Sequence, residues 1–256
     1  MREGKEVKAG DVWLGLKISD MGGKLEETAG VTSSCLLNPG CCGILDYLGT
    51  LPEEEAKTYI CWHCYAEAKL MGYRANCREC YARNAGILNA RMEDAALPHF
   101  VPGTYVRFES FGDLTGLEHL ENFCRMAQKN PGCHFLLMTK RHEIVYAYIQ
   151  EGGVVPPNLV LAGSAYKIGE MYSVGLPEGR ERQIEAETLP GHDYISIQEA
   201  FDWLRAHGVY RHTFTVWSEE QIEAGLAPRI NCGERHCKDC RACWMHAYSD
   251  RHEKLK

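Results

Sequence analysis

The sequence predicts an α/β fold, a partial parallel (β/α) barrel that carries two cysteine-rich segments. Two observations support this prediction. Apolar runs of strand composition alternate with helical stretches between residues 104 and 217, and such alternation is typical of right-handed βαβ units in a parallel sheet. About five strands suit an open or partial barrel better than a closed eightfold one. The chain also has 13 cysteines, most of them in two groups.

Composition limits the classes of function. A chain of 256 residues with 45% hydrophobic residues can form one large domain or two small ones. A net charge of −7 argues against broad, charge-driven nucleic-acid binding, although a local basic groove is compatible with it. The N-terminus has no apolar leader, and no run is apolar for the length of a membrane span. We therefore expect a cytoplasmic chain with no membrane partner, in which clustered cysteines bind metal or take part in catalysis.

The first hundred residues are expected to be mostly irregular. Residues 11–18 have strand composition, and residues 20–58 are rich in Gly, Ser, Thr and Pro, which predicts a loop with a short helix near residues 53–55. From residue 65 to about residue 92, apolar side chains recur at three- and four-residue steps. This spacing predicts a helix that ends before Pro98.

Strands and helices then alternate. The predicted strands are residues 104–109, 134–138, 158–162 and 212–217, and the predicted helix faces span residues 117–127 and 144–149. Ser196 and Ser218 are expected to cap two further helices. Residues 165–195 show the least pattern and are expected to form a lid or a mobile insertion. We expect residues 1–225 to form the barrel, with a cysteine-rich insertion at about residues 35–80, and residues 226–256 to form a C-terminal metal-binding module.

Two Cys-x-x-Cys pairs, Cys61 with Cys64 and Cys77 with Cys80, are each followed by Tyr-Ala. Two thiolates at this spacing can bind one metal, because the turn between them brings both sulfurs to one side. Four such thiolates fit a structural zinc site. A pair that leads into a helix fits an iron–sulfur cluster equally well.

The C-terminal cysteine group is Cys232, Cys237, Cys240 and Cys243. Three thiolates at consecutive two-residue gaps resemble the run that binds a cubane cluster in bacterial ferredoxins, so iron–sulfur is favoured over zinc here. His236 and His246 are expected to be surface groups or to support the ligands.

The other five cysteines are predicted to differ in role. Cys124 falls within a predicted helix and Cys133 just before a predicted strand, so both are expected to be small buried hydrophobes. Cys35, Cys41 and Cys42 lie in the loop, from which they could supply a further thiolate to a cluster.

Polar residues follow the predicted strands, and ligands bind at the carboxyl ends of parallel strands. Lys140 and Arg141 come directly after an apolar strand, where the helix dipole disfavours cations, which indicates an anionic ligand. Asp113 and Ser218 can alternatively be helix caps. The candidate catalytic residues are Asp113, Lys140 and Arg141, and the candidate cofactor-binding residues are Ser110, Gly112, Asp113, Thr139, Lys140 and Ser164.

Four motifs follow one another along the chain: Cys64-Tyr65-Ala66 or Cys80-Tyr81-Ala82, then Gly112-Asp113, then Thr139-Lys140, and finally Cys237, Cys240, Cys243 and Trp244. In the order of these motifs the chain resembles the phage and bacterial gene-product-eighty-eight family. The same Cys-Tyr-Ala-Glu start and Thr-Lys-Arg strand end occur in another phage group that is similar to radical S-adenosylmethionine (SAM) enzymes. That resemblance implies a partial barrel with a [4Fe–4S] cluster held by three thiolates near its mouth and SAM on the open iron. The usual Cys-x3-Cys-x2-Cys signature is absent, since Lys57 and Tyr73 stand four residues before Cys61 and Cys77.

Three functions are compatible with this sequence. The favoured hypothesis is a radical SAM-like iron–sulfur enzyme acting on an unidentified small-molecule or macromolecular substrate. The second is a non-enzymatic zinc protein that presents loops to a protein or nucleic-acid partner. The third is a nucleic-acid-modifying factor with structural metal, which the acidic net charge and the lack of a carboxylate motif disfavour.

Overall fold

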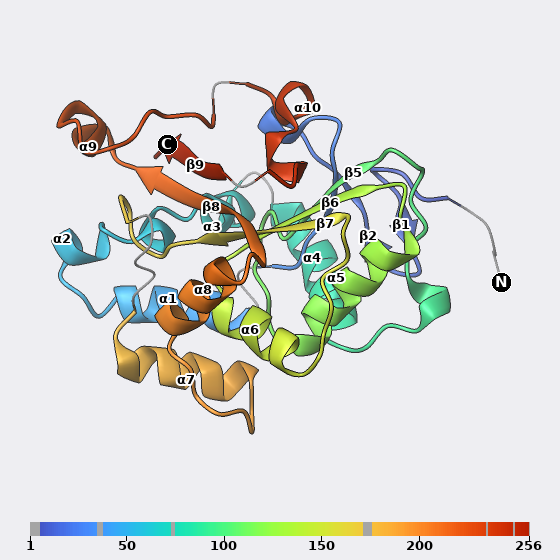
Figure 1. The fold of residues 1–256 in the computed structure, drawn as a ribbon, viewed down its shortest axis with the longest axis horizontal. Helices are drawn as coiled ribbons and strands as arrows, with labels where there is room; N and C mark the ends of the chain where they lie inside the picture. Colours follow the sequence, from blue (N-terminus) through green and yellow to red (C-terminus); the bar gives the residue numbers. More distant parts are fainter. Residues whose placement is uncertain are drawn as a thin grey trace.

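A seven-stranded sheet forms the centre of the molecule (Figure 1). The computed structural model describes residues 6–34, 38–72, 75–170, 176–233, 235–247 and 249–255, with the backbone alone for residues 39–42 and 178. In spatial order the strands are β3 (Ser19–Asp20), β4 (Ala29–Val31), β5 (Tyr105–Phe108), β6 (His134–Thr139), β7 (Leu159–Ser164), β8 (Tyr210–Trp217) and β9 (Ser249–Lys254). Only β3 is antiparallel to its neighbour.

The sheet confirms the prediction of parallel strand–helix units. Val106 pairs with Phe135 and Leu137 with Leu161, all in parallel register. Successive strands are spatial neighbours, because each helical connection returns the chain to the next position in the same sheet. Among the described residues the two edge strands, β3 and β9, do not pair with each other, so the fold is mixed α/β with an open sheet.

The two faces of the sheet are covered differently. Helices α5 (Leu117–Lys129), α6 (His142–Gln150) and α8 (Ile197–Ala206) lie on one side, and α10 (Cys237–Cys240) lies on the other (Figure 1). Successive side chains of β5 point to opposite faces of the sheet, which explains this arrangement. Phe108 stacks on Phe123 of α5 with ring centroids 4.0 Å apart, whereas Tyr105 meets Trp244 of the C-terminal segment at 5.6 Å.

The N-terminal part differs from the sequence expectation. Residues 11–18 form a hairpin of β1 (Val12–Trp13) and β2 (Leu16–Lys17), not one strand. Positive φ angles at Leu14 and Gly15 make the tight turn that divides the run. The expected loop contains β4 and helix α1 (Pro39–Leu48), and the short helix is confirmed as α2 (Glu53–Ala56).

The long helix predicted from residue 65 is interrupted. It consists of α3 (Tyr65–Met71), the 3₁₀ turn η4 (Ala75–Cys77) and α4 (Arg78–Leu88). Gly72 is the C-cap of α3 and has non-helical angles, φ −105° and ψ −125°, which end the helix. The break puts the second Cys-x-x-Cys pair at the start of α4.

The segment expected to be a lid contains helix α7 (Glu178–Thr188), which packs against α1. The helix has no apolar stripe, since Ile184 is its one large apolar residue, so apolar periodicity could not reveal it. Its contact with the core is made by Ile184 and by Leu189 just beyond its end, both of which are buried.

Helix α7 supplies a pH-dependent contribution to stability. Burial raises the pKa of Glu185 to about 7, and the nearby carboxylates of Glu143 and Glu181 act in the same direction. A raised folded-state pKa means that the contribution is present below pH about 4.5 and is lost as the pH rises through about 7. We expect Glu185→Gln to raise the melting temperature at pH 8 and to leave it nearly unchanged at pH 4. Equal melting temperatures for variant and wild type across this range would contradict the assignment.

Both predicted serine caps are confirmed. Ser196 and Ser218 begin α8 and α9 (Glu219–Glu223), each in a capping box. Strand β9 was not predicted, because its sequence is polar and its pairing with β8 depends on tertiary contact. Within the described ranges, no helix has both the length and the apolar character needed to cross a membrane.

Candidate metal and ligand site

The first Cys-x-x-Cys pair is fixed at the carboxyl edge of the sheet. Its turn, η3 (Ile60–His63), follows a backbone bridge between Tyr59 and Lys167, the latter just beyond β7. The amide of Ile60 donates to the carbonyl of Tyr166 at 2.7 Å, and the amide of Ile168 donates to the carbonyl of Thr58 at 2.8 Å. These bonds hold Cys61 beside the strand ends.

Cys61 lies among three of the predicted site residues. Burial raises the pKa of its thiol to about 11, the ammonium of Lys140 opposes this rise, and Cys64 and Asp113 add to it. The structure therefore brings Cys61 and Cys64 together with Asp113 and Lys140. Without a metal this thiol stays protonated at neutral pH, whereas a bound cation would favour the thiolate.

Asp113 ties the end of β5 to the end of β6. Its carboxylate accepts hydrogen bonds from the hydroxyl of Thr139 at 2.5 Å, the amide of Lys140 at 3.0 Å and the amide of Leu114 at 2.8 Å. It is not the cap of the next helix, because the N-cap of α5 is Gly116. Asp113 thus fixes the backbone from which the side chain of Lys140 extends.

The adjacent cations, Lys140 and Arg141, have different surroundings. Lys140 acts electrostatically on Cys61 and Tyr65. Arg141 is buried and donates from Nε to Glu143 at 2.6 Å, and its other nitrogens reach the carbonyl of Leu114 and the hydroxyl of Thr188. These contacts give Arg141 a structural role and leave Lys140 as the cation of the site.

The second Cys-x-x-Cys pair joins the first through an apolar cluster. Cys64, Cys77 and Cys80 all pack against this cluster, whose central ring is Phe111 just after β5. The cluster as a whole consists of Met21, Ala66, Leu70, Tyr81 and Phe111. The three thiols therefore share a nonpolar environment at the same edge of the sheet.

Glu109 forms a buried network that the sequence did not identify. Its carboxylate accepts hydrogen bonds from the amide of Ser33 at 3.0 and 3.1 Å and from the Ser33 hydroxyl at 2.9 Å, and it lies 3.1 Å from Nε2 of His119. Glu109 has a φ of 47°, a strained conformation for a residue other than glycine. A Cβ at Gly112 would stand 2.3 Å from the carboxylate, so only glycine fits there. The sequence feature that could have indicated this network is an acidic residue, Glu109, directly after an apolar strand.

The C-terminal cysteines gather on the opposite face of the sheet from α5. Lys24 donates to Sγ of Cys232 at 3.2 Å and pairs with Glu253 at 2.7 Å. Cys237 interacts electrostatically with Cys232 and Cys240, and Cys243 interacts with Cys232 and Cys237. Burial raises the pKa of Cys243 to about 11 and also raises that of Cys237. The four predicted ligands are thus neighbours, with a lysine beside them.

Trp244 anchors this cysteine group to the sheet. Its indole nitrogen donates to the carbonyl of Val106 at 3.2 Å, and its ring packs on Leu136 and Val160. Cys237 and Cys243 pack against the same apolar cluster. The proposed C-terminal module therefore shares a core with the sheet, and β9 is its edge strand.

Arg107 lies between the two cysteine groups. It acts electrostatically on Tyr65 from the first group and on Cys237 and Cys243 from the second. The hydroxyl of Tyr65 donates to the carbonyl of Ser110, which fixes the ring at the end of β5. Arg107 is therefore within electrostatic range of residues from both groups.

The remaining predicted residues have mixed positions. Ser164 ends β7, and its carbonyl lies 3.1 Å from a ring nitrogen of buried His142, whose pKa burial lowers to about 3. The hydroxyl of Ser110 lies 3.8 Å from the sulfur of Met21. Cys124 and Cys133 are buried in the core as predicted. The thiols of Cys35, Cys41 and Cys42 lie outside what the structure describes. Across the described ranges, no three His, Cys, Asp or Glu side chains converge at metal-binding distances.

A family model described as Gene product 88 matches residues 2–246, which include both cysteine groups. This match confirms the family that the motifs predicted. Searches among curated proteins and among solved structures found no match, and nothing in these comparisons relates the chain to radical SAM enzymes. Since the match covers nearly the whole sequence, the chain belongs to the Gene product 88 family.

Proposed function

We propose that this protein is a radical SAM-like iron–sulfur enzyme built on a partial β/α barrel, with a second metal–thiolate centre near its C-terminus. The observation that carries the proposal is the placement of Cys61 and Cys64 beside Asp113 and Lys140. These residues lie at the carboxyl edge of consecutive parallel strands, where α/β folds bind their ligands. The single layer of helices on one face supports the barrel interpretation.

The residues at this edge fit a thiolate-bound cluster. Three of the four thiols of Cys61, Cys64, Cys77 and Cys80 would supply its ligands and leave one iron open, and metal binding would have to draw their sulfurs closer together. The hydroxyl of Tyr166 is buried, interacts electrostatically with Cys61 and Asp113, and has no hydrogen-bond partner among the described residues. It would gain a partner from a polar ligand at this edge. When bound, a cluster with an open iron supplies the electron that cleaves SAM.

The protein's own side chains have separate tasks in this proposal. Lys140 would pair with the carboxylate of SAM, since an ammonium attracts a carboxylate strongly where water is excluded. Asp113 positions Lys140 through the backbone amide. Phe111 and Tyr81, with ring centroids 5.6 Å apart, cover the thiols and keep water from a radical.

The test is an anaerobic assay on reconstituted protein. Iron, sulfide and zinc are measured first, and the reduced protein is then incubated with SAM and analysed for 5′-deoxyadenosine. We expect iron and sulfide to be bound and 5′-deoxyadenosine to form. Lys140→Gln should retain its iron but lose most of this activity through weaker SAM binding, whereas Lys8→Gln, on the exposed N-terminal segment, should behave as wild type.

A structural zinc protein is the second candidate. The mutual proximity of Cys232, Cys237, Cys240 and Cys243 favours it for the C-terminal centre, because four thiolates around one ion leave no open position. Stoichiometric zinc at both centres, without absorbance in the visible range and without 5′-deoxyadenosine, would reject the enzyme and establish this alternative.

A further inference from the structure

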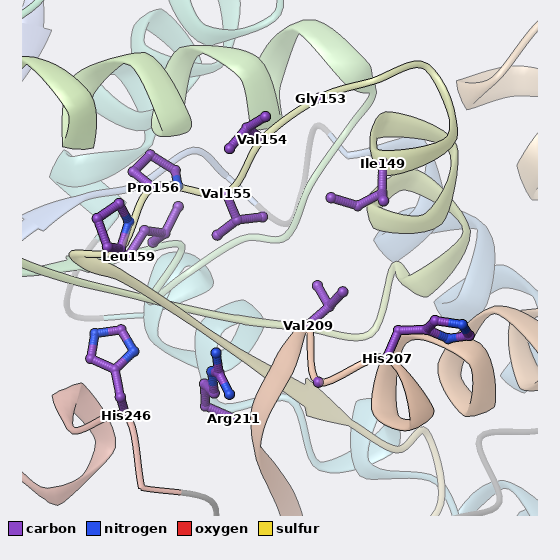
Figure 2. A pocket seen from close by; sticks show the side chains of 12 residues that line it. Ile149, Gly153, Val154, Val155, Pro156, Leu159, His207, Val209, Arg211 and His246 are labelled. Atoms are coloured by element: carbon purple, nitrogen blue, oxygen red, sulfur yellow. The ribbon is translucent and has the colours of Figure 1, made fainter.

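A cavity of about 450 Å³ opens at the amino edge of β7 and β8, the edge opposite to the one that holds Cys61. It is bounded by the end of α6, the connection from α6 to β7, the turn before β8 and His246 of the C-terminal segment (Figure 2). Its volume is within the range of small-molecule sites. None of the cysteines assigned to the metal centres lines it.

One wall of this cavity is apolar and preformed. Val154, Val155 and Leu159 lie on this side in Figure 2, together with Pro156. Val154 is 64% exposed, which is unusual for an aliphatic side chain beside other apolar groups. The two prolines that follow Val155 restrict the connection, and the amide of Gly153 donates to the carbonyl of Tyr148 at 2.8 Å. The wall therefore needs little ordering when a ligand binds.

The other side of the cavity carries three basic side chains beside Val209. Figure 2 shows Arg211, His207 and His246 there, and no acidic side chain lines the cavity. Arg211 is exposed, and the part of the chain that the structure describes gives its guanidinium no hydrogen-bond or ion-pair partner. An arginine that shares a cavity with an apolar wall and with no acidic side chain is unusual in a chain of net charge −7.

We infer that this cavity binds a small amphipathic carboxylate, with its apolar body against Val155 and Leu159 and its carboxylate on Arg211. Apolar contact area supplies the affinity, and a planar guanidinium matches the geometry of a carboxylate. The absence of acids in the lining makes an anion the complementary charge. This site is independent of the proposed chemistry at the cysteine centres.

The inference can be tested with octanoate and its uncharged analogue octanamide. Protein labelled at Val and Leu methyl groups is titrated with each compound and followed by NMR. We expect saturable shifts at Val154, Val155, Leu159 and Val209, with octanoate binding about fivefold more tightly than octanamide, the size expected for an exposed ion pair.

Two variants and one control variant separate the contributions to binding. Arg211→Gln should remove the preference for octanoate and leave octanamide binding unchanged, and Arg229→Gln, at an exposed arginine outside the cavity, should change neither. Val154→Asp should weaken binding of octanoate more than that of octanamide. The inference is overturned if neither compound shifts these methyl groups, or if Arg211→Gln binds octanoate as wild type does.

Discussion

Replacement of Cys237 by Ser is expected to release the metal of the C-terminal centre and to lower the free energy of unfolding by several kcal/mol. Cys237 is packed against the cluster of Leu136, Val160 and Trp244, so its sulfur would join the proposed metal to the sheet. In such small centres the free energy of metal binding is also free energy of folding. Cys240→Ser should have the same effect on metal content. The measurements are metal per chain by elemental analysis and unfolding in denaturant.

A matched control is available in Cys133, a buried thiol that donates to the carbonyl of Val101 at 3.2 Å. Cys133→Ala should cost about 1 kcal/mol through lost packing and leave the metal content at the wild-type value. Unchanged metal content in both Cys237→Ser and Cys240→Ser would refute the C-terminal centre. A full loss of metal in Cys133→Ala would show that metal content follows general destabilisation and not ligand identity.

The second large effect is expected from Arg141→Met, with a loss of about 4 kcal/mol in the free energy of unfolding. The substitution leaves the carboxylate of Glu143 buried without its cation, which is typically far more costly than losing an exposed pair. Burial already raises the pKa of Glu143, and Arg141 opposes that rise. Without the arginine this pKa rises further, so the loss of stability should be greater at pH 8 than at pH 4.

The double variant Arg141→Met, Glu143→Leu tests this assignment. It removes both charges of the pair, so it should regain most of the stability lost in the single variant. A structural Arg141 also predicts that the folded single variant binds SAM with wild-type affinity. If Arg141→Met unfolds like the wild type but fails to cleave SAM, the arginine acts in catalysis and the structural assignment is wrong.

Local sequence patterns were sufficient for the central strands and their helices. The strands β5, β6 and β7 are short apolar runs between turn residues, and each amphipathic helix between them can bury its stripe only against the sheet. The caps at Ser196 and Ser218 need only nearby residues, so they too were predictable. The family was predictable from short motifs in their order along the chain, and the family match covers residues 2–246.

Other features depend on contacts between residues far apart in sequence. Strand β9 is polar and becomes a strand by pairing with β8, and α7 has no apolar stripe. Arg141 and Lys140 are adjacent, yet only the packing of α7 puts the hydroxyl of Thr188 beside the arginine and not beside the lysine.

The sequence by itself determined the α/β class, the parallel succession of β5 to β8 and the identity of the two cysteine groups, because these depend on local periodicity and spacing. The tertiary structure alone decided where those groups lie. The backbone bridge between Tyr59 and Lys167 takes Cys61 to the carboxyl edge beside Lys140, and Trp244 fixes the C-terminal cysteines to the face that carries Arg107. Such long-range placement is set by the burial of apolar surface and the pairing of distant backbone groups, which no short segment encodes.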